Sequence, residues 1–195
     1  MIIEDTELSG MDSEKNSLVS IGGIDLDDPK NQFYGECRVW EGSQINQEGI
    51  DIAGFTAEQV TDPKKQTESE LVKKFIEWAH TCKEHTLSGQ NPYLDTLFMR
   101  NATKRGNMTW DFPHRTIDVH TLCYMHMVKR KITPTVVNNG SGLSSKEITK
   151  YVGIPLEPFP HNALNGAKQS AEAISRLLYD KKLLPEFEKY PIPWI

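Results

Sequence analysis

The chain has 195 residues and a mass of 22.2 kDa, which is long enough for one domain with a substantial buried core. Hydrophobic residues make up 37% and charged residues 25%, which excludes a disordered chain, and the formal charge of −5 excludes a wholly basic protein that coats nucleic acid. No apolar run approaches the roughly 20 residues of a membrane span, and Met1–Asp5 resembles no secretion signal.

The first 40 residues predict three strands in an antiparallel meander. A short apolar start leads into Asp5-Thr6-Glu7, and residues 18–26 and 33–40 are rich in strand-preferring types. The turn-forming residues 27–31 separate the last two strands, which is typical of a hairpin.

After residue 55 the pattern changes to helices that alternate with short strands. Apolar residues at helical spacing, capping residues and a proline at a first helical position predict helices. They span residues 56–60, 69–79, 92–103, 122–129, 145–152 and 163–182, with strands over 86–89 and 116–119. This order predicts an α/β fold whose mixed sheet has an antiparallel half and a parallel half, flanked by helices. We expect one domain over residues 1–182 and an extended, proline-containing tail over 183–195.

The three cysteines, Cys37, Cys82 and Cys123, are odd in number and widely spaced. A disulfide frame or a zinc site would need closer or paired spacing, so we expect free thiols. Free thiols are typical of a reducing compartment, which predicts a cytoplasmic protein with no membrane association.

Asp5 and Glu7 are the first candidates for chemistry. Side chains two residues apart on a strand point to the same face, so these carboxylates repel each other unless a cation lies between them. Hard oxygen ligands suit Mg²⁺ or Mn²⁺, and ligands of mixed α/β sheets bind at the carboxyl ends of strands, where the strand order reverses. Taken alone, such an acidic pair at the end of a strand is more often a solvated turn.

Two further candidates stand next to predicted helices. Asp95 lies one turn after Pro92, which suits the first position of a helix, and an acid there also complements the helix dipole. His161 precedes an alanine-rich helix, where an imidazole serves either as a general base at neutral pH or as a cap or surface group.

Three motifs occur in a characteristic order: Asp5-x-Glu7, Gly89-Gln90-Asn91-x-x-x-Asp95 and His161-x-Ala163-Leu164-x-x-Ala167. Together they resemble the DEDDh 3′–5′ exonucleases, the DnaQ-like branch of the ribonuclease H-like fold. Residues 50–56 are similar to the loop before the first helix of that family, and 148–155 to the helix before its third motif. The resemblance spans about residues 1–180.

The resemblance implies two Mg²⁺ or Mn²⁺ ions per site, or fewer here, which clamp the attacking and leaving oxygens of a phosphodiester displacement. Their ligands would be Asp5, Glu7 and Asp95, and His161 would take the proton from the attacking water. Thr6, Leu8 and Asn91 would lie beside the 3′-terminal nucleotide. The implied partner is single-stranded nucleic acid or a 3′ end, DNA or RNA, the product is a nucleoside 5′-monophosphate, and a homodimer is compatible with the family.

The chain departs from the family at the fourth carboxylate. In the family an Asp follows the motif-three histidine by five residues, but here that position is Gly166, which offers no ligand and weakens a helix interior by roughly 1 kcal/mol. Either the substitution impairs an active lineage, or the chain is a degenerate module that keeps nucleic-acid binding, or the site works with fewer ligands. In the last case water, Asn165 or Glu172 would fill the gap, and Asp118 is a further possible replacement.

The sequence therefore predicts a 3′–5′ exonuclease that is impaired at its fourth metal ligand. The alternative is a catalytically inactive nucleic-acid-binding module of the same fold. A more distant alternative is an unrelated α/β protein, which would leave the acids and His161 far apart.

Overall fold

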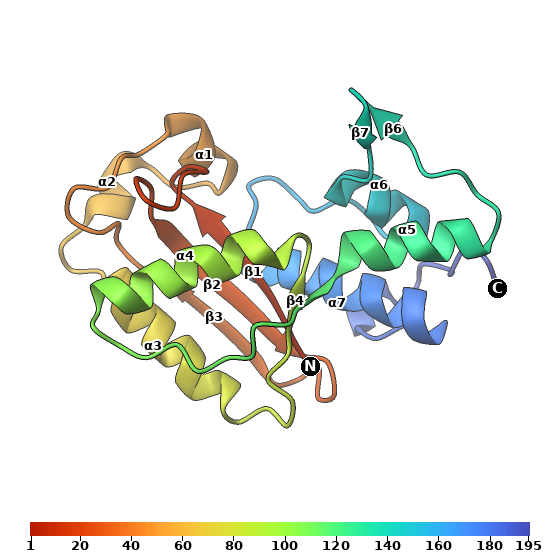
Figure 1. The fold of residues 1–195 in the computed structure, drawn as a ribbon, viewed down its shortest axis with the longest axis horizontal. Coiled ribbons are helices and arrows are strands. Elements are labelled where there is room, and N and C mark those ends of the chain that lie inside the picture. The colour runs from red at the N-terminus through yellow and green to blue at the C-terminus, as the bar shows by residue number, and fades with distance from the viewer.

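A five-stranded mixed sheet in the order β3-β2-β1-β4-β5 forms the centre of the computed structural model, which describes all residues 1–195 (Figure 1). The strands are β1 Ile2–Leu8, β2 Leu18–Asp25, β3 Gln32–Glu36, β4 Leu87–Gly89 and β5 Ile117–Asp118. β1 pairs antiparallel with β2 and parallel with β4, so the strand direction changes at β1. The predicted fold class is confirmed, and β1 is the strand at which the order reverses.

Helices cover both faces of this sheet (Figure 1). They are α1 Gln47–Ile52, α2 Ala57–Thr61, α3 Glu68–Ala79, α4 Pro92–Arg105, α5 Val119–Lys129, α6 Ser145–Val152 and α7 Ala163–Tyr179. A short hairpin, β6 Val136–Val137 and β7 Gly140–Ser141, and a 3-10 turn, η1 Pro185–Phe187, complete the chain. The sequence pattern did not predict α1, the hairpin or η1. Residues 50–52, which were expected to lie in a loop, belong to α1. α5 also begins earlier than predicted, since Asp118 accepts from the backbone N–H groups of His120 and Thr121 and caps it.

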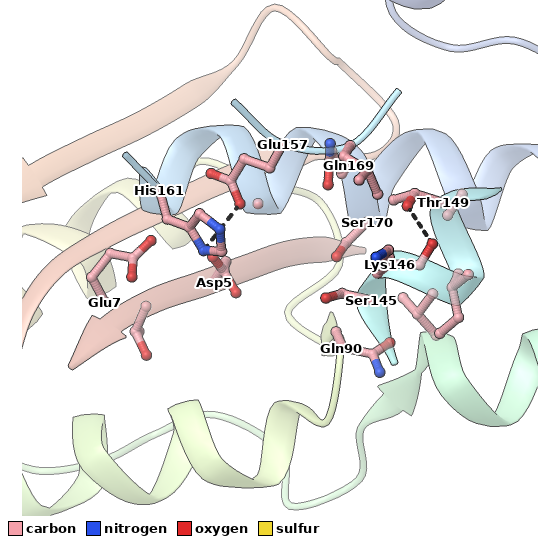
Figure 2. A pocket seen from close by; sticks show the side chains of 16 residues that line it. Asp5, Glu7, Gln90, Ser145, Lys146, Thr149, Glu157, His161, Gln169 and Ser170 are labelled. Atoms are coloured by element: carbon pink, nitrogen blue, oxygen red, sulfur yellow. Dashed lines mark hydrogen bonds and ion pairs between the residues drawn. The ribbon is translucent and has the colours of Figure 1, made fainter. Parts of the chain in front are cut away.

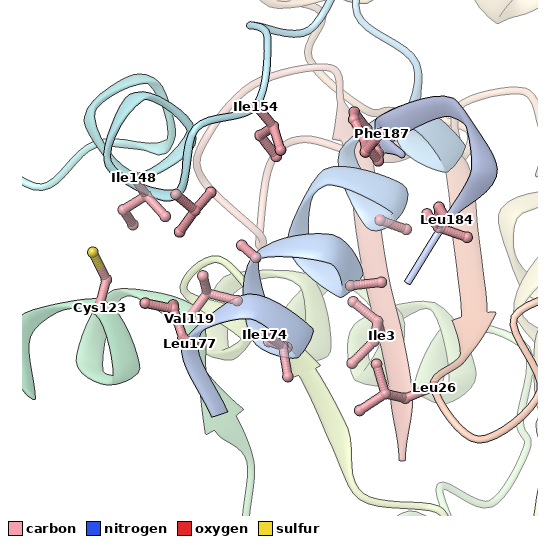
Figure 3. Close-up of a cluster of buried hydrophobic side chains, with 14 of the residues drawn as sticks. Ile3, Leu26, Val119, Cys123, Ile148, Ile154, Ile174, Leu177, Leu184 and Phe187 are labelled. Atoms are coloured by element: carbon pink, nitrogen blue, oxygen red, sulfur yellow. The ribbon is translucent and has the colours of Figure 1, made fainter. Parts of the chain in front are cut away.

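The two faces of β1 contribute to two separate cores. Ile2 belongs to the cluster packed against α3 and α4, whereas Ile3 belongs to the cluster beneath α5, α6 and α7 (Figure 3). Because side chains alternate along a strand, Asp5 follows Ile3 and faces α7. The same alternation puts Thr6 on the face of α4.

Gly22 allows the start of α7 to approach the sheet closely. It pairs with Asp5 across the β1–β2 ladder. A Cβ at this position would overlap the backbone of Ala163 and Leu164, so only glycine permits this approach. The first turn of α7 therefore lies directly beside Asp5.

The segment that follows α7 folds back onto the domain. Leu184, Phe187 and Ile192 are buried, and the first two join the core beneath α5–α7. Residues 183–195 were expected to be extended and irregular, but they pack against the domain because these apolar side chains find room beside α7. Cys37, Cys82 and Cys123 are all free and buried.

None of the helices combines the length and the apolar character that a membrane crossing requires.

Candidate active site

A cavity of about 400 Å³ opens where the carboxyl end of β1 meets the first turn of α7 (Figure 2). Asp5, Glu7, His161 and Gly166 all line it. An adjoining cavity of about 350 Å³ shares Asp5 and Glu7 and adds Asp95. The structure thus brings together three acids and one imidazole that lie up to 156 positions apart in the sequence, from Asp5 to His161.

Asp95 reaches β1 from the first turn of α4. Its Oδ1 accepts the backbone N–H of Thr6 at 3.0 Å and also the Thr6 hydroxyl. Burial raises the pKa of Asp95 to about 6, although these hydrogen bonds act in the opposite direction. The two hydrogen bonds fix the carboxylate at the end of β1, and Oδ2 takes no part in them.

Burial and mutual repulsion also act on the two acids of β1. Burial raises the pKa of Asp5 well above its usual value, and the charges of Asp95 and Glu7 raise it further. Burial, followed by the charges of Glu157 and Asp95, raises the pKa of Glu7 to about 8. A cation among these carboxylates would oppose both effects, because it favours their charged forms.

His161 stands at the rim of the larger cavity, just before α7. Its backbone N–H donates to the carbonyl of Ile52 at 2.8 Å, which ties this segment to the end of α1. The imidazole Nδ1 lies 3.7 Å from Oε2 of Glu157, and 44% of the side chain is exposed. A partly exposed imidazole that lines the cavity can accept a proton from a water there.

The architecture matches solved nucleases. The chain is similar to the nuclease domain of 3′hExo, a DEDDh family member bound to rAMP, with 18% identity and a TM-score of 0.70, over 94% of this chain and 93% of that one. The chain has the fold of the DEDDh exonuclease domains. The sequence resemblance is thereby confirmed at the level of the fold.

Two more structures share this DEDDh fold. Cell-death related nuclease 4 matches at 14% identity and a TM-score of 0.70, over 98% of this chain and 65% of that one. E. coli exonuclease I in complex with a dT13 oligonucleotide matches at 15% identity and a TM-score of 0.69, and the chain spans 40% of its length. No protein-family model matches the sequence, and no curated protein matches it.

Gly166 stands where the DEDDh resemblance implies a fourth acid. A Cβ at this position would overlap the carboxylate of Asp5, whose side chain occupies the space above the glycine. The overlap involves the far end of a flexible side chain, so a larger residue at 166 requires Asp5 to turn away.

Two of the acids considered as replacements are committed elsewhere. Glu172 is fully buried, pairs with Arg176 and accepts two backbone N–H groups, so it does not reach the cavity. Asp118 caps α5 and also accepts the N–H of Asn91. Asn165 lines neither cavity.

The predicted substrate contacts divide into two groups. Thr6 lines both cavities and Leu8 lines the smaller one, whereas Asn91 lines neither and begins α4 in a left-handed conformation. The role of Asn91 stays a prediction. Its neighbour Gln90 belongs to the second motif but was given no role there. It lines both cavities, and its Oε1 is buried without a hydrogen-bond partner.

Glu4 is a further acid that sequence reasoning missed. It is 1% exposed, and neither carboxylate oxygen has a hydrogen-bond partner. Burial, then the charges of Asp95 and Asp5, raises its pKa well above the usual value. The sequence did carry a signal for Glu4: it is an acid at a strand position that alternation predicts to be buried.

The donor chemistry of the site fits a divalent cation. Asp5, Glu7 and Asp95 offer hard oxygen ligands, and Gln90 Oε1 is a buried oxygen that lacks a donor. No three His, Cys, Asp or Glu side chains are already arranged around one point. A bound ion would therefore draw these carboxylates together rather than enter a preformed cage.

Proposed function

We propose that the protein is a 3′–5′ exonuclease of DNA or RNA that releases nucleoside 5′-monophosphates. The observation that carries this proposal is the convergence of Asp5, Glu7, Asp95 and His161 at the end of β1, in a fold shared with DEDDh nucleases. Two of the similar structures hold rAMP or a dT13 oligonucleotide, which supports a nucleic-acid substrate without choosing between RNA and DNA.

Asp5, Glu7 and Asp95 would hold Mg²⁺ or Mn²⁺. A divalent ion supplies an activated water and stabilises the charge that develops on the phosphate. Two ions per site are the family arrangement, and the missing carboxylate at Gly166 favours weaker binding of one of them.

His161 would take the proton from the attacking water. Its Nδ1 faces Glu157, so Nε2 is the nitrogen available to the cavity. Thr6 and Leu8 line the smaller cavity, together with the apolar side chains of Ile52 and Leu94, and would contact the 3′-terminal nucleotide there. Asn91 would act from the adjacent turn.

Gly166 specifically supports a second candidate function. A site that lacks one carboxylate has less negative charge with which to bind metal, so the chain would bind nucleic acid without cleaving it. This candidate predicts that the chain binds nucleic acid as tightly as an exonuclease would, but releases no product.

A degradation assay separates the two functions. Labelled DNA and RNA oligonucleotides, each with a free or a blocked 3′ end, are incubated with Mg²⁺, with Mn²⁺ or with chelator. We expect 5′-monophosphates only from free 3′ ends and only with metal. Binding without product supports the second candidate, and neither binding nor product contradicts both.

A further inference from the structure

The segment between α6 and α7 brings one more acid, Glu157, to the larger cavity. Oε1 of Glu157 accepts the backbone N–H of Asn162 at 2.8 Å, which fixes the side chain at the start of α7. The side chain is only 12% exposed. Figure 2 shows it on the same side of the cavity as His161, opposite β1.

The second oxygen of Glu157 remains available. Oε2 lies 3.7 Å from Nδ1 of His161, which is longer than a hydrogen bond, so this contact is an ion pair when the imidazole is protonated. Oε2 therefore keeps lone pairs for another partner in the cavity.

Glu157 lines the same cavity as Asp5 and Glu7 of β1. The fold therefore brings it into their surroundings, although it lies about 150 residues away in the sequence.

Two acids that were considered as replacements for the missing carboxylate have partners that hold them. Glu172 is bound by Arg176, and Asp118 by the first turn of α5. Gly166 offers no oxygen, and the carboxylate of Asp5 lies against it. Glu157 is the acid of the cavity that does not come from β1 and still has an uncommitted oxygen.

We propose that Glu157 is the fourth acidic group of this site, in place of the carboxylate that Gly166 cannot supply, and that it helps to hold the divalent cation. This inference rests on the proposed metal-dependent function. It restores four carboxylates to the site, with the fourth coming from the segment before α7 rather than from the helix.

Calorimetric titration of the metal-free protein with Mn²⁺, without nucleic acid, tests the proposal. Glu157→Gln keeps an oxygen that can accept from Asn162 but removes the charge, and should weaken Mn²⁺ binding about 10-fold or more. Glu77→Gln on the exposed surface of α3 makes the same chemical change away from the cavity and should leave the affinity unchanged. Thermal melting without metal checks that each variant is folded.

A second pair of variants links Glu157 to position 166. If Glu157 replaces the missing acid, then Gly166→Asp should restore Mn²⁺ affinity to the Glu157→Gln protein. Glu157→Asp, which keeps the charge, should retain more affinity than Glu157→Gln, and it supplies the test if Glu157→Gln does not fold.

The outcomes are distinct from those of the nuclease assay. Unchanged Mn²⁺ affinity in Glu157→Gln overturns the role of Glu157 even if the protein degrades oligonucleotides. The same result with a reduced turnover number would mean that Glu157 only positions His161. Weakened Mn²⁺ binding in a protein that never cleaves nucleic acid would support Glu157 and contradict the exonuclease function.

Discussion

Buried acids near the two ends of α7 differ in whether they have positively charged partners. Towards its C-terminus, Glu172 and Arg176 are both fully buried, and Oε1 of Glu172 accepts from Nε of Arg176 at 2.7 Å. Oε2 of Glu172 accepts the N–H groups of Leu183 and Leu184, each at 2.9 Å. At the N-terminal end, Asp5 and Glu7 lie beside other acids, and neither pairs with a cationic side chain.

This contrast separates an acid that the protein pairs from acids that it leaves unpaired. A buried charge is costly unless it is paired and hydrogen-bonded. The protein provides those partners for Glu172, which ties the C-terminal segment to α7. It leaves Asp5 and Glu7, which lie beside the start of α7, without such partners, and the proposed cation would supply the missing positive charge.

Glu172→Ala should produce the largest loss of stability. It leaves the guanidinium of Arg176 buried without its carboxylate, which typically costs about 3–5 kcal/mol. Urea denaturation should show this loss, while Glu172→Gln, which keeps an acceptor, should lose less. A loss below about 1 kcal/mol for Glu172→Ala would contradict a structural role for this pair.

Asp5→Asn, in contrast, should lower the activity without lowering the stability. Removing a proposed metal ligand should lower the exonuclease rate by more than about 100-fold, beyond what loss of an outer-shell partner costs. The metal-free protein should be at least as stable as the unaltered chain, since one repelling charge is gone. Rate assays and melting curves on the same preparation measure both, and retained activity would remove Asp5 from the site.

Gly166→Asp should raise the Mn²⁺-dependent rate about 10-fold, the lower end of the range for a supporting metal contact, because Glu157 already supplies an acid. The new side chain requires the carboxylate of Asp5 to turn away from position 166. Gly166→Asn has nearly the same size without the charge and is the matched control. Equal rates for the unaltered chain and the Gly166→Asp variant at saturating metal would exclude a missing ligand.

The stability of the metal-free protein should fall as the pH rises. Glu7 has an ordinary pKa of 4.5 when unfolded and about 8 when folded, so the folded state retains a proton that the unfolded state releases. Stability is therefore fully present below about pH 4.5 and is lost as the pH rises through 8. We expect a loss of up to about 3 kcal/mol between about pH 5 and 8, measured by denaturation at each pH.

Saturating Mn²⁺ should remove most of this pH dependence, because the cation stabilises the charged carboxylates. An equal slope with and without Mn²⁺ would show that the ion does not bind among these acids. Asp5→Asn should also flatten the slope, since the pKa of Asp5 is itself raised by burial and the amide does not titrate.

The sequence predicted where the candidate residues lie when a strict period or a fixed spacing was present. Asp5 and Glu7 share a face because strands alternate, and Asp95 follows the start of its helix by one turn. Glu172 was misjudged as a possible ligand. Six residues along a helix correspond to about 240° of rotation from Gly166, which turns Glu172 away from the cavity.

The remaining site residues carried no local signal. Glu157 lies in a segment without a period, and its position depends on the hydrogen bond to Asn162 and on the anchoring of His161 to Ile52. Gln90 belongs to the second motif, but the resemblance assigned a substrate contact only to its neighbour Asn91. Neither side chain could be placed before the loops were folded against the sheet.

The sequence by itself determined the mixed sheet, the order of the motifs and the absence of a carboxylate at position 166, because these follow from periodicity and residue identity. Only the tertiary structure decided which acids are neutralised by the protein and which face a common cavity. That distinction depends on partners distant in the chain, such as Leu183 and Leu184 for Glu172, and on the close approach of α7 to β1 that Gly22 permits.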